Sequence, residues 1–243
     1  MLECYNIYIE ENIPEGELAA LLSVLPEERQ ERFRKLQQRE RAGHYIVTSA
    51  FMQYGISRAL ELPIQGIRYQ YGIQGKPELV ESLVEQTGKA DFSLSHSGSY
   101  AVLAVSDVAV GMDVERKMQN RDRIAKRFFC REEYEDIQNG RDEKERNRRF
   151  LAYWTMKEAY IKRDGRGLQI PLSSFRIHRY DRTCSVVEGR EAYFATVPLE
   201  DTSYMVSVCS GGREQLENMV IAANSGNLLI KKVTVQELLK GIW

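Results

Sequence analysis

The chain of 243 residues is long enough for one large domain or two small ones, and either can bury a hydrophobic core. Its 34 basic and 35 acidic residues balance, which excludes an overall field that would attract nucleic acid or an anionic membrane. Any anion-binding site must therefore be a local cluster of cations.

The cysteines, at Cys4, Cys130, Cys184 and Cys209, are scattered and contain no Cys-x-x-Cys pair, which indicates neither a zinc site nor a disulfide framework. The longest apolar runs, such as AVLAV at 101–105, are too short to span a bilayer. The N-terminal stretch MLECYNIYIEEN carries early acids and lacks the apolar segment of a signal peptide. We therefore expect a reduced, cytoplasmic protein without a membrane segment.

Hydrophobic periodicity predicts two successive sets of elements. The first set is a strand near 4–10, helices near 26–39 and 43–60, and strands near 66–72, 91–95 and 99–105. The second set is a strand near 108–115, helices near 121–137 and 148–162, and strands near 174–180, 192–197 and 203–209. Between the helices of the second set, NGRDEKERNRR (139–149) is polar throughout and predicts a loop or the solvated start of a helix.

Two stretches of sequence recur at nearly the same spacing. SYAVLAVS at 99–106 returns as SYMVSVCS at 203–210, and LELPIQGIRY at 60–69 returns as LQIPLSSFRI at 168–177. Coincidence among common strand residues is one explanation. The common order of helix, proline exit and strands favours the other, a duplicated α+β unit of domain size.

The duplication predicts three segments. They are an N-terminal α+β repeat at 1–106, a C-terminal α+β repeat at 107–211 and an extension at 212–243 that has no counterpart in the first repeat.

Carboxylates recur at positions where they could meet. In AVGMDVERK, a strand period of two places Asp113 and Glu115 on the same face. Glu158 lies on the same helical stripe as Trp154, where an unpaired carboxylate would be costly to bury. An ordinary wet strand face is one interpretation. Convergence of the three carboxylates, whose hard oxygens suit Mg²⁺, is the other.

Candidate anion-binding residues lie elsewhere in the chain. The stretch FSLSHSGSYAV (92–102) places a histidine among serines at a strand end, and GKP (75–77) places a lysine in a turn. The helix beginning at PEERQER carries Arg29 and Arg32, although such runs usually form a solvated face. No P-loop or dinucleotide-binding glycine motif occurs, so any phosphate would be bound by side chains.

Taken together, these motifs resemble the 4′-phosphopantetheinyl transferases of the Sfp-type, two-repeat class. The resemblance covers most of the chain in order: PEERQER, GKP, FSLSHSG, GMDVE, IAKRFFCREEY and WTMKEAYIKRDGRGLQIPLSSF. It implies an α+β fold made as a pseudo-dimer of two similar halves, with the active site in the cleft between them. It also implies transfer of the 4′-phosphopantetheine arm of coenzyme A to a serine of an apo carrier protein, which releases adenosine 3′,5′-bisphosphate.

The resemblance assigns roles to individual residues. The implied ligands of Mg²⁺ are Asp113, Glu115 and Glu158, and the implied catalytic residues are Glu158, Lys162 on the pyrophosphate and, as the second choice of base, Glu133. The implied contacts with coenzyme A are Arg29, Arg32, His44, Gly75, Lys76, Pro77, Ser95, His96, Lys157 and Lys162.

Two of these implied roles keep an alternative. Relatives often have an arginine where ERAGHY places His44, so that contact could come instead from Arg41 or Arg39. Lys157 could equally face solvent, and Lys162 could form only an i,i+4 ion pair with Glu158.

The resemblance also implies the partners, which are coenzyme A and an acidic apo acyl or peptidyl carrier protein. We expect a monomer that binds no nucleic acid and no membrane. The segment RKMQNRDRIAKRFF (116–129) combines cations with apolar residues, and we expect part of it to dock the carrier. A solvated helix face is the competing interpretation. A non-catalytic coenzyme A-binding protein of the same fold is the alternative function, although the presence of all three carboxylates argues against it.

Overall fold

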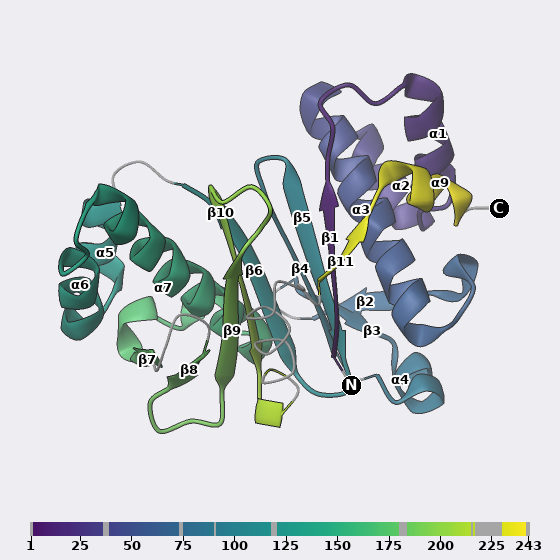
Figure 1. The fold of residues 1–243 in the computed structure, drawn as a ribbon. Coiled ribbons are helices and arrows are strands. Elements are labelled where there is room, and N and C mark those ends of the chain that lie inside the picture. The colour runs from purple at the N-terminus through teal and green to yellow at the C-terminus, as the bar shows by residue number, and fades with distance from the viewer. Residues whose placement is uncertain are drawn as a thin grey trace.

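The computed structural model describes residues 2–35, 39–72, 75–89, 91–117, 121–179, 184–214, 216 and 230–241. Within these ranges the chain forms two α+β halves, each with one sheet and one long helix (Figure 1). The two sheets lie side by side in the middle, with α3 (Arg39–Leu60) beyond one and α7 (Glu143–Asp164) beyond the other. The predicted fold class, two similar α+β halves, is confirmed.

The N-terminal half is built on a sheet with the strand order β11-β1-β5-β4. These strands are β11 (Ile230–Val233), β1 (Leu2–Tyr8), β5 (Tyr100–Ser106) and β4 (Asp91–Ser97). The other helices of this half are α1 (Glu15–Ser23), α2 (Glu27–Arg34), α4 (Glu81–Thr87) and α9 (Val235–Lys240). A separate hairpin pairs β2 (Tyr69–Tyr71) with β3 (Pro77–Leu79).

The C-terminal half is built on a sheet with the strand order β6-β10-β9-β8-β7. These strands are β6 (Val110–Arg116), β10 (Tyr204–Ser210), β9 (Tyr193–Pro198), β8 (Cys184–Val187) and β7 (Ile177–Arg179). Two short helices, α5 (Arg121–Phe128) and α6 (Arg131–Gln138), precede α7.

The sheet topology reproduces the sequence repeat. In each half the first strand pairs with the last, and the last pairs with the one before it, so β1-β5-β4 corresponds to β6-β10-β9. The recurring Ser-Tyr segments form β5 and β10, which occupy the same place in this order. The match of sequence repeat to strand position favours duplication over coincidence.

The structure divides one expected helix and defines two other segments more closely than the sequence did. The helix expected at 121–137 is two helices, because a capping box between Cys130 and Glu133 starts a new helix. The polar stretch at 139–149 is largely the start of α7, whose first turn is capped by Asp142 accepting from the Glu145 N–H at 2.7 Å. The C-terminal segment returns to the N-terminal half, where β11 pairs in parallel with β1.

The core has three parts. One lies between α3 and its sheet, and a second lies between α7 and its sheet. The third joins the two sheets, where Val102 and Cys4 from one pack with Met112, Val114 and Val208 from the other. This third cluster holds the halves together, so residues from both sheets keep a fixed separation.

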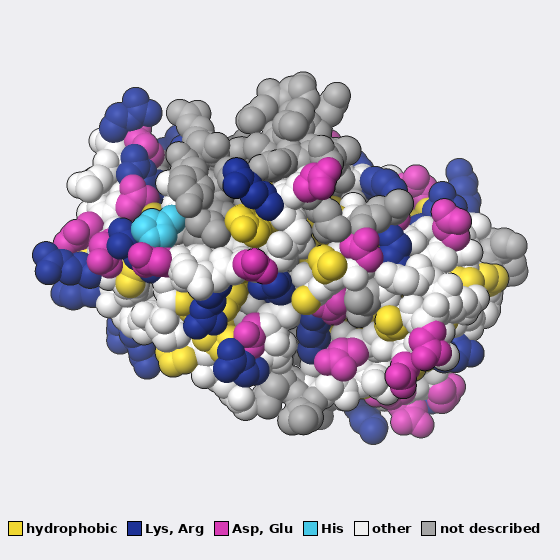
Figure 2. All heavy atoms as spheres, turned by 90° about the horizontal axis from the view of Figure 1, so that it is seen from below, with side chains coloured by type: hydrophobic (Ala, Val, Ile, Leu, Met, Phe, Trp, Pro, Cys, Tyr) yellow, Lys and Arg dark blue, Asp and Glu magenta, His cyan; other side chains and the backbone are white. Residues whose placement is uncertain are grey.

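No helix in the described ranges is long and apolar enough to cross a membrane. On the face seen in Figure 2, basic and acidic side chains are interspersed, as the balanced composition predicts. No large patch of one charge sign is visible on that face.

Candidate active site

Carboxylates from β6 and a lysine from α7 meet where the two halves touch. Lys162 Nζ lies 2.6 Å from Asp113 Oδ1 and 2.7 Å from Ser95 Oγ. The Ser95 hydroxyl in turn donates to Asp113 Oδ1 at 2.7 Å. Because Ser95 is on β4 and Asp113 is on β6, this contact unites the halves.

The pKa values of Asp113, Glu115 and Glu158 indicate that these carboxylates interact electrostatically. Burial raises the pKa of Asp113 and of Glu115. The pKa of Glu158 is raised to about 7, first by burial and then by the negative charge of Asp113, with a further contribution from Glu115. Like charges raise one another's pKa only when they lie close together. Asp113, Glu115 and Glu158 therefore lie within electrostatic range of one another.

One oxygen atom of this cluster is available to bind a cation. Asp113 is 3% exposed, and its Oδ2 atom is buried without a hydrogen-bond partner. An unpaired buried carboxylate oxygen is costly, so it is a site where an ion would be stabilised. Among the described residues no three acids, histidines or cysteines already stand in a metal-holding arrangement. The ammonium of Lys162 lies against Asp113 instead.

Gly111 lets α7 approach β6 closely. A Cβ atom at this position would lie 1.8 Å from the carbonyl oxygen of Ala159 and 2.6 Å from the backbone nitrogen of Arg163. Both are backbone atoms of α7, so no side-chain rotation could relieve the clash. The absence of a side chain thus brings Glu158 and Lys162 to the carboxylates of β6.

A row of β4 side chains forms the seam between the halves. Ser93, Ser95 and Ser97 alternate along β4, an edge strand of its sheet, and all face β6. Ser93 Oγ accepts from the Met112 N–H at 2.9 Å, and Ser97 donates to Glu115 Oε2 at 2.8 Å. Of these three serines, only Ser95 was predicted as a site residue. The period of two in DFSLSHS was the available signal for the others.

Histidines from both β4 and α3 lie at the rim of this cluster. The His96 side chain is exposed, yet enough protein surrounds it to lower its pKa, and the charges of Lys162 and His44 act in the same direction. His44 on α3 therefore lies within electrostatic range of His96. The structure thus places His44 near His96, whereas the side chains of Arg39 and Arg41 lie outside what it describes.

The other predicted anion contacts lie further along the N-terminal half. Gly75 is in the left-handed region at φ 76°, in the turn of the β2–β3 hairpin, and Pro77 begins β3. Lys76 is ion-paired with Asp91 at 2.8 Å, so its ammonium is anchored to the start of β4. Arg29 and Arg32 both lie on α2, where Arg32 is exposed.

Two predicted site residues lie in the core instead. Lys157 is 0% exposed and Glu133 is 1% exposed, and their side chains are ion-paired at 2.9 Å. Lys157 also donates to the carbonyl oxygens of Leu172 and Phe175. Side chains enclosed in this way cannot touch a substrate. The assignments of Lys157 to coenzyme A binding and of Glu133 to catalysis are therefore wrong.

Breaking this buried pair should cost stability rather than catalysis. Lys157→Met is expected to lower the free energy of unfolding by about 3–5 kcal/mol, because Glu133 would be left buried without its partner. Urea unfolding measures this loss, and Lys144→Met, at an exposed position of the same helix, is the matched control. Unchanged stability with a raised KM for coenzyme A would restore Lys157 to the site.

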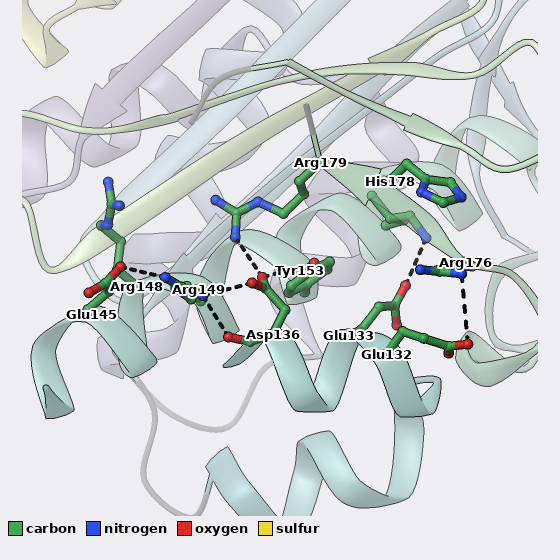
Figure 3. Close-up of a pocket in the computed structure, with 11 residues that line it drawn as sticks. Glu132, Glu133, Asp136, Glu145, Arg148, Arg149, Tyr153, Arg176, His178 and Arg179 are labelled. Carbon is green, nitrogen blue, oxygen red and sulfur yellow. Dashed lines mark hydrogen bonds and ion pairs between the residues drawn. The ribbon is translucent and has the colours of Figure 1, made fainter. Parts of the chain in front are cut away.

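A cavity of about 410 Å³ lies away from the carboxylate cluster, between α6, the start of α7 and β7 (Figure 3). Asp136 lies at its centre and accepts hydrogen bonds from Arg149, Arg179 and Tyr153. Glu145 pairs with Arg149 at 2.7 Å. Because these charges neutralise one another, the network indicates a structural role.

Comparisons with known proteins agree with the two halves. Residues 109–209 match the family model described as the 4′-phosphopantetheinyl transferase superfamily, and residues 13–108 match that of the 4′-phosphopantetheinyl transferase N-terminal domain. The holo-[acyl-carrier-protein] synthase of Thermotoga maritima aligns with 52% of this chain and 98% of its own at a TM-score of 0.35 and 14% identity, a likeness too weak to bear on the site.

Three curated relatives cover most of the chain. The 4′-phosphopantetheinyl transferase Sfp of Bacillus subtilis is 28% identical over 91% of this chain and 98% of its own length. The 4′-phosphopantetheinyl transferase psf-1 of Bacillus pumilus is 34% identical over 74% of this chain and 75% of its own. The 4′-phosphopantetheinyl transferase gsp of Aneurinibacillus migulanus is 26% identical over 98% and 94%. This chain therefore belongs to the 4′-phosphopantetheinyl transferase superfamily, as an enzyme of its two-domain, Sfp-type class.

Proposed function

We propose that this enzyme transfers the 4′-phosphopantetheine arm of coenzyme A to a serine of an apo acyl or peptidyl carrier protein in a Mg²⁺-dependent reaction, releasing adenosine 3′,5′-bisphosphate. The observation that carries the proposal is the meeting of Asp113, Glu115, Glu158 and Lys162 at the contact between the halves. Because one chain supplies the whole cluster, a monomer suffices.

Asp113, Glu115 and Glu158 are the residues that would hold Mg²⁺. The fit rests on the unpartnered Oδ2 of Asp113 and on hard carboxylate oxygens, which are the ligands that this ion takes. A bound Mg²⁺ would supply charge neutralisation at the pyrophosphate of coenzyme A.

The protein's own groups then carry the proton and the developing charge. In the transfer, the carrier serine oxygen forms a bond to phosphorus, and the bond from phosphorus to the leaving adenosine 3′,5′-bisphosphate breaks. Glu158, directly or through a water, takes the serine proton. Lys162 stabilises the negative charge that develops on the leaving phosphate.

The remaining contacts would hold the rest of coenzyme A. Ser95, His96 and His44 would contact the pyrophosphate, and the support is that Ser95 accepts a hydrogen bond from Lys162 and that His96 lies within electrostatic range of Lys162 and His44. The hairpin turn with Gly75 and Lys76 would hold the adenine nucleotide, and Arg29 and Arg32 on α2 would bind the 3′-phosphate, for which forked guanidinium donors are well suited.

Incubation with coenzyme A, Mg²⁺ and a panel of apo carrier proteins tests the proposal directly. Mass spectrometry of each carrier should show the added phosphopantetheine arm on its serine. A carrier panel that stays unmodified, while coenzyme A still binds the protein in calorimetry, would favour the non-catalytic alternative.

The raised pKa of Glu158 predicts a pH-dependent stability of the metal-free protein. With a folded-state pKa of about 7 against an ordinary value of 4.5, the neutral form stabilises the fold at low pH, and this contribution is lost as the pH rises through 7. Glu158→Gln should therefore melt with the wild type at pH 4 and above it at pH 8, when chelator is present.

Mg²⁺ should reverse that order at pH 8. The ion should raise the melting temperature of the wild type and leave Glu158→Gln nearly unchanged, because the amide removes a charged ligand. Differential scanning fluorimetry at both pH values measures these shifts. Equal stabilisation of the two proteins by Mg²⁺ would remove Glu158 from the ligand set.

One cation of the segment 116–129, which we expect to dock the carrier protein, does not lie on its exposed surface. Arg121 is only 9% exposed and is ion-paired with Glu143, so it belongs to the contact between α5 and α7. The exposed cations that remain in this segment are Arg116, Lys117, Arg123, Lys126 and Arg127, and residues 118–120 lie outside the described ranges.

Charge reversal at two of these positions tests the surface. Lys117→Glu with Arg123→Glu should raise the KM for an acidic carrier about tenfold at low salt and less at high salt, with the KM for coenzyme A unchanged. Arg141→Glu, at an exposed arginine beyond α6, is the control. A carrier KM that stays the same at low salt would place docking elsewhere.

A further inference from the structure

Three tyrosines surround the guanidinium of Arg29. Its Cζ atom lies 5.8 Å from the ring centre of Tyr45, 5.6 Å from that of Tyr69 and 5.8 Å from that of Tyr71. Arg29 Nε donates to the Tyr69 hydroxyl at 3.1 Å, and the Tyr45 hydroxyl donates to the Arg29 carbonyl oxygen at 3.3 Å. We call Tyr45, Tyr69 and Tyr71 the tyrosine cage.

The caged cation has no counter-ion among the side chains that the structure describes. Among the described residues no carboxylate is hydrogen-bonded or ion-paired with Arg29, whose side chain contacts the three tyrosines and, through Nη2, the Met52 sulfur at 4.0 Å. Arg34, on the same helix, instead pairs with Glu27 at 2.8 Å. A half-buried guanidinium without an anion is costly, and ring faces repay only part of that cost.

The cage also limits how the guanidinium can turn. With Nε bound to Tyr69, the two amino groups are donors to which no described carboxylate is paired. Paired N–H groups on one edge match two oxygens of a phosphate. A lysine could not make this arrangement, because it has neither a plane to stack on the rings nor an Nε donor for Tyr69.

The cage is built into the same framework as the active site. Tyr69 and Tyr71 are on β2, whose hairpin turn carries Lys76. The Tyr69 ring packs edge-on against Phe92, with ring centres 6.4 Å apart, and Phe92 is a buried residue of β4. The guanidinium is thereby held at a fixed place relative to Ser95 and His96 further along that strand.

We propose that the tyrosine cage presents Arg29 as a preformed receptor for a phosphate monoester, and that its members are positioning residues for the 3′-phosphate of coenzyme A. The assignment of that phosphate rests on the proposed function. The evidence for a phosphate receptor is the Arg29 guanidinium, which the tyrosine cage holds without a counter-ion among the described side chains. The cage makes the enzyme distinguish nucleotides that carry a 3′-phosphate from those that lack it.

Binding measurements separate this proposal from the transfer reaction. Adenosine 3′,5′-bisphosphate and adenosine 5′-monophosphate are titrated by calorimetry into the wild type, Tyr71→Leu and Tyr69→Phe. Tyr71→Leu should lose about tenfold of the preference for the bisphosphate, the size of one cation–π contact, with the monophosphate affinity nearly unchanged. Tyr69→Phe keeps the ring and its packing on Phe92 and should lose about threefold, so it tests the cage even if Tyr71→Leu does not fold.

A double-mutant cycle shows whether the tyrosines act through Arg29. In an Arg29→Met background the preference should already be reduced, and Tyr71→Leu should reduce it no further. Arg34→Met should keep the wild-type preference. Two results would overturn the proposal. One is that Tyr71→Leu lowers the affinity for both nucleotides equally; the other is that Tyr71→Leu lowers the preference for the bisphosphate by the same factor with and without Arg29. If no carrier protein were modified, the proposed transfer would be refuted. The role of the tyrosine cage would still be tested, because it depends only on the ratio of the affinities for the bisphosphate and the monophosphate.

Discussion

Glu158→Gln is expected to reduce kcat for phosphopantetheine transfer at least about 10³-fold, because it removes both a charged ligand and the proposed base while keeping the side-chain volume. The Glu158 side chain lies on α7, within electrostatic range of Asp113 and Glu115. Steady-state transfer kinetics and far-UV circular dichroism on the same preparation separate lost chemistry from lost structure.

Two controls sharpen this experiment. Glu132→Gln, at an exposed position of α6, should keep wild-type turnover. Chelation of the metal should silence the wild type, and added Mg²⁺ should restore it. Near-normal turnover of Glu158→Gln at saturating Mg²⁺ would show that neither proposed role of Glu158 is correct.

Gly111→Ala is expected to have the next largest effect, at a residue that touches no substrate. The added Cβ would meet the Ala159 carbonyl oxygen at 1.8 Å, so α7 must move away from β6. That movement would separate Glu158 and Lys162 from Asp113. A misplacement of about 1 Å costs on the order of 10²-fold in rate, and the overpacked contact costs about 1–3 kcal/mol of stability.

The signature of this effect is a loss of kcat larger than the loss of stability explains. Transfer rates measured well below the melting temperature, together with urea unfolding, give both quantities. Gly16→Ala is the matched control, since a Cβ there would have no atom within 4 Å. A Gly111→Ala enzyme with wild-type kcat would mean that the close approach of α7 to β6 is not needed for the reaction.

The sequence by itself determined the features that depend on local periodicity. The period of two placed Asp113 and Glu115 on one face of β6, and the helical period placed Glu158 and Lys162 one turn apart on α7. The repeated Ser-Tyr strands indicated a duplication, and β5 and β10 take the same place in their two sheets.

Only the tertiary structure decided which charged groups are accessible. Lys157 and Glu158 are adjacent in the chain, yet one is enclosed in the core and the other faces the contact between the halves. Helical periodicity could not separate them, because α7 is covered by β6 and β10 on one side and by α5 and α6 on another. A charged residue on such a helix is buried or functional according to what packs against it.

Local sequence periodicity also could not predict which distant segments pair with one another. β11 pairs with β1 across nearly the whole chain, with Ile230 opposite Cys4. The tyrosine cage likewise joins Tyr45 of α3 and Tyr69 of β2 around Arg29 of α2. Local periodicity assigns a residue to a face of its own element, whereas the partner of that face is chosen by packing among elements far apart in sequence.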